Sequence, residues 1–531
     1  MDAAAAMEKQ QQPGGEEEEE VISSVRYRGW KSMPYVIGNE TFEKLGTIGT
    51  TANLLVYLTT VYHLPSVRAA TLLNFFSGTT NLAPLLGAFL SDTFLGRYTT
   101  IAAASLASCL GMLVLTLTAA IPSLHPPPCT ASSSSSSCQG PTHGQLAALL
   151  AAFAFLVVGA GGIRPCNLAF GADQFDPRTD SGRRGIASFF NWYYFTFTVA
   201  MMLSATLIIY LQSNVSWAIG LAVPAALMAI SCALFFMGTR LYVRVRPEGS
   251  PFTSFARVIV AAVRKRRVPA PASADDLFDP PHQSKLVAKI KHTDQFRWLD
   301  KAAVVTAEDA VVDGMSAAAA NPWRLCTVQQ VEEVNLLAWI IPVWSSSIVY
   351  YVMLTQLGTY TVFQVMQSDR RVGRSGFEVP AGSMVVFNMV ALTAWLPVYD
   401  RAVVPALRRV TGREEGITAI GLNELCYKES PESMRSVAGA LSPLALAVAS
   451  YASGAMVTAV ERATGWLAQD IDKGRVDLFY LVVGAMSAAN LAYFVVCALW
   501  YRSKNIADHG GVELLQTSSK HNADAPPAMA V

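Results

Sequence analysis

Long apolar segments recur through most of this chain and constrain its fold more than any other feature. Blocks of about 20 to 28 largely apolar residues alternate with short polar stretches. A helix needs about 20 apolar residues to cross the hydrocarbon core of a bilayer, where it satisfies its own backbone hydrogen bonds. Only 15% of the residues are charged, whereas a soluble protein carries about a quarter. The sequence therefore predicts an all-α, polytopic membrane protein.

The predicted spans fall into two groups separated by a polar region. The first group has six spans, at residues 33–62, 69–93, 98–121, 144–170, 187–211 and 217–241. The second group has four, at residues 334–357, 379–398, 436–460 and 478–501. This pattern predicts a disordered cytoplasmic tail (1–31), an N-terminal six-helix bundle (32–241), a cytoplasmic linker with amphipathic helices (242–333), a C-terminal bundle (334–503) and a cytoplasmic tail (504–531).

The distribution of basic residues predicts the orientation of these spans. Lys and Arg occur in the loops after the second and fourth spans and in the linker, whereas the loops after the third and fifth spans contain none. Because positively charged loops remain in the cytoplasm, we expect the N terminus and the linker there. The arginines at 370–374 oppose this orientation, but several loops outweigh one. A short amphipathic helix at about 255–263 is expected to lie on the membrane surface.

Three ionisable residues lie inside the first predicted span. In a helix Glu40 shares a face with Glu43 and Lys44, and a Glu four residues before a Lys is the favourable order for an ion pair. Charges are costly inside a bilayer and therefore indicate a functional site. Two acids and one base leave one excess negative charge, which a bound proton would remove. The cluster is thus a candidate proton carrier.

Arg164 lies well inside the fourth predicted span, within the glycine-rich segment 159–165. The glycines allow either close helix approach or local unwinding. A permanent cation in an apolar run needs a carboxylate partner or an anionic ligand. We expect Arg164 to pair with the carboxylates of the first span, so that protonation of a Glu would change the pair. The alternative is a fixed structural ion pair.

Two further groups of polar residues are candidates for function. Asp92 and Arg97 flank a glycine turn after the second span, which fits a gating hinge with an ion pair at the membrane face, or else an ordinary capped turn. In the seventh span, Tyr350, Thr355 and Gln356 carry hydroxyl and amide groups that could line a substrate cavity, with packing as the alternative.

The sequence carries no motif of an enzyme or of a metal site. It has no nucleophile–base pair and no CxxC or His/Cys metal pattern, and none of its seven histidines lies inside a predicted span. We therefore expect no catalytic activity, no bound metal and no cofactor.

Several ordered motifs resemble those of the plant nitrate/peptide transporter family, the plant branch of the proton-dependent oligopeptide transporters in the major facilitator superfamily. The marks are Glu40, Glu43 and Lys44, and the segments 87–97, 161–167, 170–176, 299–303, 323–326, 331–334 and 430–435. The resemblance covers residues 30–503 and is greatest for the nitrate and glucosinolate carriers. It implies two six-helix halves that face each other across a central cavity.

The resemblance also implies roles for particular residues. In this family the motif that matches Glu40, Glu43 and Lys44 is taken to couple transport to protons, and a basic residue usually stands where this chain has Arg164. Thr100 matches a regulatory phosphosite of a family member, although its sequence context fits a basophilic kinase only weakly.

The chain departs from the family pattern in three places. Val199 stands where peptide carriers have an Asn, and Leu354 where a His is implicated in nitrate binding. Nitrate would then depend on Arg164, Lys44, hydroxyl groups or other donors, which suggests a lower affinity or a different anion. In addition, Thr418 and Ala419 are contiguous here, whereas the family places most of two spans between the matching segments. Roughly seventy to ninety residues are then missing, which leaves about ten spans instead of twelve. A splice variant or an incomplete gene model would explain this.

Together these features predict a proton-coupled secondary active symporter of nitrate or a related small anion. We expect protons, the small anion and the lipid bilayer as partners, no nucleic acid, and a location in the plasma membrane. One alternative is a proton-coupled carrier of a larger specialised metabolite, such as a glucosinolate or a hormone conjugate. Another is a non-transporting sensor or a defective truncated isoform.

Overall fold

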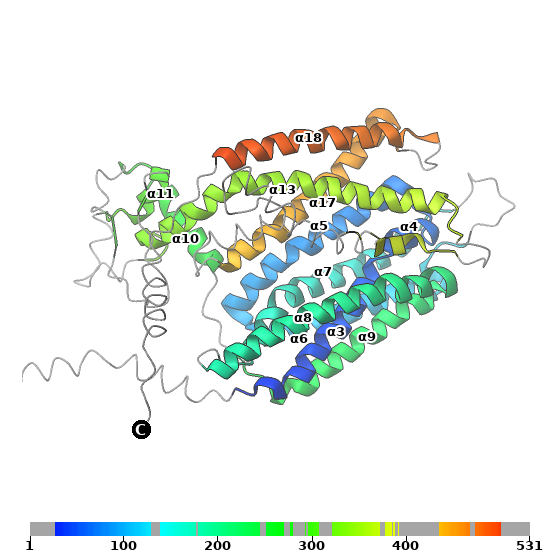
Figure 1. The fold of residues 1–531 in the computed structure, drawn as a ribbon, viewed down its shortest axis with the longest axis horizontal. Helices are drawn as coiled ribbons and strands as arrows, with labels where there is room; N and C mark the ends of the chain where they lie inside the picture. Colours follow the sequence, from blue (N-terminus) through cyan, green and yellow to red (C-terminus); the bar gives the residue numbers. More distant parts are fainter. Residues whose placement is uncertain are drawn as a thin grey trace, which may run out of the picture. The chain divides into compact units, whose positions relative to one another are not determined.

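The structure is a computed structural model and consists almost entirely of helices (Figure 1). It describes residues 27–128, 139–176, 179–244, 251–269, 277–279, 292–293, 296–306, 321–371, 378–384, 386–387, 391, 435–467 and 473–500. Within these residues extended backbone pairs at two isolated bridges, Leu277 with Val304 and Arg371 with Glu378, and no strand forms. The predicted all-α class is confirmed.

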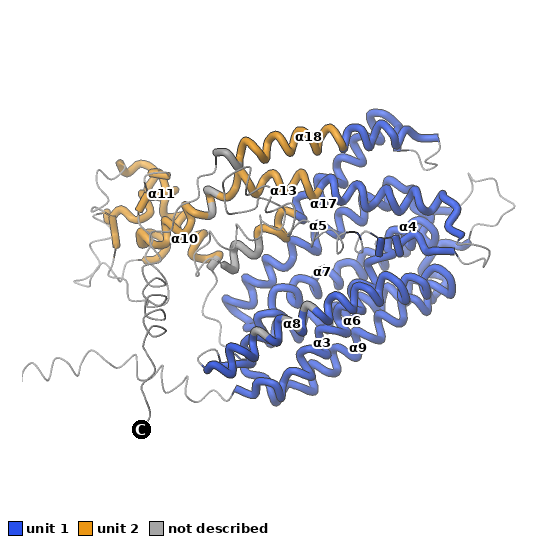
Figure 2. Tube along the Cα trace, viewed as in Figure 1, with its two compact units in different colours: residues 1–249, 352–403, 446–483 blue, residues 250–351, 404–445, 484–531 orange. Residues whose placement is uncertain are grey.

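The chain divides into two compact units (Figure 2). Unit 1 comprises residues 1–249, 352–403 and 446–483, and unit 2 comprises residues 250–351, 404–445 and 484–531. Each unit is described by itself below.

Unit 1 contains the helices of all six predicted N-terminal spans. They are α3 (Met33–Thr51), α4 (Leu54–Thr60), α5 (Ser66–Leu90), α6 (Arg97–Ala120), α7 (His143–Ala172), α8 (Asp180–Leu203) and α9 (Trp217–Met237). Short π-helical turns extend α5 through Ser91–Leu95 and follow α8 at Ser204–Ile208 and Leu211–Val215.

The first predicted span is interrupted rather than continuous. Helix α3 ends at Thr51 and α4 begins at Leu54, because the backbone of Asn53 leaves the helical region. The side chain of Asn53 is buried and donates a hydrogen bond to the Ser213 hydroxyl at 3.1 Å. Asn often favours such side-chain contacts over a helix interior.

Close helix approach positions the charged residues of unit 1. Helix α7 packs against α5 and α6, while α3 packs against α9. A Cβ atom on Gly162 of α7 would lie 2.6 Å from Ala104 Cβ and 3.0 Å from the Thr100 carbonyl oxygen of α6. Residue 162 must therefore be a glycine for these backbones to meet. Helix α7 stays helical through Pro165, so the glycines allow close packing and not unwinding.

Later segments of the chain also belong to unit 1. They include the second part of α13 (Val328–Gln367), the second part of α17 (Arg435–Thr464) and the start of α18 (Val476–Trp500). Tyr451 of α17 packs its ring on Gly78 of α5 and shares a hydrogen bond of 2.9 Å with the Thr79 hydroxyl. Helix α17 therefore packs against the second predicted span.

Unit 2 contains the folded part of the predicted linker. Helix α10 (Pro251–Arg264) packs with α11 (Arg297–Asp300), the 3₁₀ turn Lys301–Ala303 and the start of α13. Val258 and Ala261 on α10 are completely buried in this cluster. The expectation that this amphipathic helix lies on the membrane surface is wrong for its apolar face, because that face is covered by protein.

Within the described part of the chain, seven helices are long and apolar enough to cross a membrane: α6, α7, α8 with its π-helical extension, α9, α13, α17 and α18. Helix α3 is not in this set, since Glu40, Glu43 and Lys44 interrupt its apolar run. Most of the predicted span at 379–398 lies outside the described residues, and so does the junction between Thr418 and Ala419.

Candidate functional site

Helix α3 brings Glu40, Glu43 and Lys44 into one buried cluster. Lys44 Nζ lies 3.3 Å from Glu40 Oε1 and 3.0 Å from Glu43 Oε2. Both glutamates are only 3% exposed. One ammonium is therefore shared by two carboxylates that water scarcely reaches, as the helical spacing predicts.

The two carboxylates have different second partners. The amide of Asn167 on α7 donates a hydrogen bond of 2.5 Å to Glu40 Oε2. The hydroxyl of Thr47, one turn further along α3, donates a hydrogen bond of 2.8 Å to Glu43 Oε1. Tyr193 of α8 also interacts with Glu40. Glu40 is thus held between helices, whereas Glu43 is held within its own helix.

Arg164 has a different partner from the one expected. Its Nη1 donates a hydrogen bond to Asn81 Oδ1 of α5 at 3.1 Å. Among the described residues, no carboxylate lies within ion-pairing distance of its guanidinium, although Glu43 is close enough to interact with it electrostatically. The predicted direct ion pair is therefore not formed here. The guanidinium instead donates a hydrogen bond to the neutral amide of Asn81.

A small cavity separates Arg164 from the α3 cluster. Its walls come from α3, α5, α6 and α7, namely Glu43, Thr47, Thr50, Thr51, Phe76, Thr80, Ser108, Leu156, Ala160 and Arg164. The side chain of Arg164 is exposed, and it lines this cavity. Glu43 and Arg164 thus line the same cavity, together with several hydroxyl groups.

Three threonine hydroxyls of this cavity donate hydrogen bonds to backbone carbonyl oxygens of their own helices. Thr50 donates to Gly46 O at 2.8 Å, Thr51 to Thr47 O at 2.9 Å, and Thr80 to Phe76 O at 2.8 Å. A hydroxyl that donates in this way offers only oxygen lone pairs to its surroundings. The cavity therefore suits a hydrogen-bond donor such as water or hydronium, while Arg164 supplies its N–H groups.

Arg97 pairs with a residue other than Asp92. Its Nη1 lies 2.6 Å from Oδ1 and 2.5 Å from Oδ2 of Asp173, at the end of α7. Gly96 has a φ of 74°, which an L side chain rarely adopts, and its turn leads directly into α6. The ion pair expected at the membrane face thus exists with a different acid, and it joins two helices of the same bundle.

Thr100 is buried and its hydroxyl is occupied. It is 6% exposed, and its Oγ1 donates to Gly96 O at 3.0 Å. A kinase could reach this hydroxyl only if the first turn of α6 unwound.

The expected substrate-cavity residues of α13 are not equivalent. Tyr350 is 42% exposed, with its ring against Tyr351. Gln356 is completely buried, and its Nε2 donates to Ser453 O of α17 at 3.0 Å. Gln356 thus packs one helix against another. Thr355 accepts a bond from the Thr359 hydroxyl through its carbonyl oxygen.

Three partners of the charged residues were not identified from the sequence. These partners are Asn81 on α5, Asn167 on α7, and Asp173 at the C-terminal end of α7. Asn167 and Asp173 lie in the motif segments 161–167 and 170–176. These motifs mark the two residues as notable, but they do not indicate which charged side chain each one contacts.

The sequence of this chain is similar to those of a known protein family. A family profile described as "PTR2: POT family" matches residues 98–422. Two Arabidopsis thaliana proteins are similar over most of their length: Protein NRT1/ PTR FAMILY 2.11 (46% identity, 91% of this chain, 90% of the relative) and Protein NRT1/ PTR FAMILY 2.9 (43%, 91% and 94%).

Solved structures agree at the level of the fold. The POT family transporter PepTSo has a TM-score of 0.62 at 16% identity, covering 90% of this chain and 99% of that one. An auto-inhibited POT family peptide transporter gives 0.60 at 17% identity, covering 90% and 98%. With the helical spans and the sequence matches, these findings show that the chain belongs to the POT family of membrane transporters.

Proposed function

We propose that this transporter is a proton-coupled symporter of nitrate or a related small anion, acting in the plasma membrane. The observation that carries the proposal is the α3 cluster, in which Glu40 and Glu43 share Lys44 beside a hydroxyl-lined cavity. The family relationship supports transport, and the residues of the cluster support coupling to protons.

The charge balance favours reversible proton binding. Two carboxylates and one ammonium have a net charge of about minus one, which is costly in a poorly hydrated site. One proton makes the cluster neutral. Binding and release of that proton would therefore change how strongly the cluster attracts Arg164 and an incoming anion.

Glu43 is the better candidate for the exchanging proton. It lines the cavity, so water in that cavity can bring a proton to it. Glu40 instead accepts a hydrogen bond from the Asn167 amide and forms an ion pair with Lys44. In this proposal Glu40 keeps Lys44 in place, and Glu43 is the carboxylate that exchanges the proton.

Arg164 is the proposed anion ligand. Among the described residues its guanidinium donates one hydrogen bond, to Asn81, so further N–H groups remain for a ligand. A planar guanidinium can bind a planar oxyanion through two parallel hydrogen bonds. This role fits the presence of Leu354 at the position where the family resemblance implies a His in nitrate binding.

Transport by alternating access needs a complete second half. The alignment with NRT1/ PTR FAMILY 2.11 runs over 561 positions, although this chain has 531 residues. The relative therefore has residues where this chain has none. This supports, as a further proposal, that about two spans are missing between Thr418 and Ala419. If the sequenced transcript does not join these two codons directly, the longer protein is the one to assay.

Uptake of labelled nitrate into oocytes tests the proposed function. We expect uptake to rise at acid pH and Glu43→Gln to abolish that rise. Asp477→Asn is the matched control, because Asp477 is exposed and pairs with Arg475 at a helix end. Equal uptake at acid and alkaline pH would refute proton coupling.

Competition by glucosinolates or hormone conjugates, with no net nitrate uptake, would favour the larger substrate. No uptake of either would favour a sensor or a defective isoform.

A further inference from the structure

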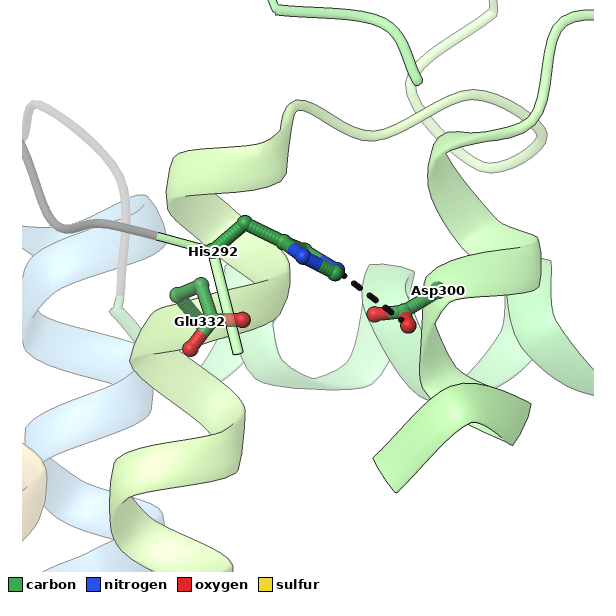
Figure 3. A group of neighbouring side chains, drawn as sticks. All are labelled: His292, Asp300 and Glu332. Atoms are coloured by element: carbon green, nitrogen blue, oxygen red, sulfur yellow. Dashed lines mark ion pairs between the residues drawn. The ribbon is translucent and has the colours of Figure 1, made fainter. Parts of the chain in front are cut away.

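A second group of ionisable side chains lies in unit 2, far from the first in sequence. His292, Asp300 on α11 and Glu332 on α13 point toward one another (Figure 3). One ligand atom from each lies within 4.8 Å of the others. Asp300 is 2% exposed and Glu332 is completely buried. Two carboxylates and an imidazole thus meet in the interior of a folded region.

The contact between His292 and Asp300 is not an ordinary hydrogen bond. Nε2 of His292 lies 3.3 Å from Asp300 Oδ2, as the dashed line in Figure 3 marks. Nevertheless, Nε2 is buried and makes no hydrogen bond to any described residue. The imidazole nitrogen and the carboxylate are thus close to each other without hydrogen-bond alignment. This arrangement fits two ligands that both face one ion between them.

The surroundings of Glu332 hold its carboxylate in place. The backbone N–H of Thr293 donates to Oε1 at 2.8 Å, and the Thr293 hydroxyl contacts Oε2 at 2.8 Å. Asn335, one turn further along α13, donates to Oε1 at 3.3 Å. Oriented ligands of this kind are typical of metal sites, where second partners fix the ligand atoms.

We propose that His292, Asp300 and Glu332 form a binding site for a divalent transition-metal ion, with zinc as its best representative. One imidazole nitrogen and two carboxylate oxygens are a ligand set that zinc accepts, with water in the fourth position. An imidazole ligand also favours zinc over calcium or magnesium. The charge of the ion balances the two carboxylates, so the site becomes neutral when it is filled.

The distances require only a small contraction. Ligands of one zinc ion lie about 2 Å from it and therefore about 3 to 4 Å from one another. The present separations of up to 4.8 Å close with side-chain movements of about 1 Å. The ion would fasten the segment 292–293 and α11 to the beginning of α13. It would thereby tie part of the linker to a predicted spanning helix.

Metal content of the full-length protein tests this site. The protein is purified in detergent on a tag without histidines, stripped with a chelator, dialysed against Zn²⁺ and analysed by mass spectrometry. We expect wild type to bind one zinc per chain. His292→Ala, Asp300→Asn and Glu332→Gln should each weaken binding by about tenfold or more. His143→Ala is the control, because His143 is exposed at the start of α7.

A ligand exchange separates a metal site from an ion pair. His292→Cys should retain zinc, since a thiolate is a good zinc ligand, whereas a simple ion pair with Asp300 would be lost. If the Ala variant does not fold, X-ray absorption of the wild-type zinc should show nitrogen and oxygen neighbours. Sulfur neighbours would overturn the proposal. Equal zinc content in wild type, Asp300→Asn and Glu332→Gln would overturn it as well.

Discussion

Each unit of this transporter buries a pair of carboxylates beside one basic residue, and the two basic residues differ. In unit 1, Glu40 and Glu43 share the permanent ammonium of Lys44. In unit 2, Asp300 and Glu332 lie beside the imidazole of His292. The ammonium leaves one negative charge, which suits a single exchangeable proton. The imidazole adds a nitrogen lone pair, which suits a metal ion. Similar acids can thus serve different chemistry because their basic partner differs.

The sharpest test of this comparison neutralises one acid in each cluster. Glu43→Gln removes the proposed proton acceptor, so acid-stimulated nitrate uptake should fall to the level of uninjected oocytes. Glu332→Gln should leave the acid stimulation intact while it removes zinc. Uptake at two pH values and zinc content, measured on both variants, check this pair of outcomes.

A crossed result would break the comparison. If Glu332→Gln abolished the acid stimulation at normal surface expression, the two clusters would serve one function. If Glu43→Gln kept the full acid stimulation, the exchanging proton would reside elsewhere. Glu40→Gln then identifies whether the other carboxylate carries it.

Removing the basic residue should have the next largest effect. Lys44→Ala leaves two buried carboxylates without their cation, which typically costs about 3–5 kcal/mol of stability. His292→Ala should cost less, because the His292 side chain keeps 19% of its exposure and its contact with Asp300 lacks hydrogen-bond alignment. Thermal unfolding in detergent micelles, followed by size-exclusion chromatography, measures the difference.

Lys44→Arg is the matched control for this prediction. It preserves the charge, so its unfolding midpoint should stay near that of wild type. An Arg variant as unstable as the Ala variant would show that packing, and not charge, determines the effect.

A packing change should have an intermediate effect, confined to the first cluster. Gly162→Ala places a methyl group 2.6 Å from Ala104 Cβ, so α7 must move away from α6. Overpacking of this kind costs about 1–3 kcal/mol. Because α7 carries both Arg164 and Asn167, nitrate uptake should fall while zinc binding is unchanged. Gly484→Ala is the control, since nothing lies within 4 Å of its added Cβ. Equal effects of both variants would contradict this reasoning.

The sequence predicts where the N-terminal helices lie, because the length of an apolar run is a local property, although α3 and α5 are not among the described helices that are apolar enough to span a membrane. The six N-terminal spans all correspond to helices, and the pairing within α3 follows from helical spacing alone. The break at Asn53 was missed, since it depends on a contact with Ser213 on a distant turn.

Partners from other helices could not be predicted in the same way. Arg164 binds the neutral Asn81, and Arg97 binds Asp173 rather than the nearby Asp92, because helix packing decides which side chains meet. The group around His292 joins residues that are forty positions apart and match no metal spacing, so no sequence pattern indicated it.

The smallest predicted effect compares the two threonines that hold the glutamates. Thr47→Val removes the hydroxyl that donates to Glu43, and a hydrogen bond to a charged group is worth about 1.5–3 kcal/mol. Thr293→Val also removes a hydroxyl, but the backbone N–H of residue 293 still donates to Glu332. Its cost should therefore be nearer about 0.5–1.5 kcal/mol. Unfolding midpoints of both variants check which of the two costs more stability. Thr51→Val is the control, because among the described residues the Thr51 hydroxyl donates only to backbone carbonyls. If Thr293→Val were the more damaging, the Thr293 hydroxyl rather than the backbone would orient Glu332, and the proposed zinc site would depend on it.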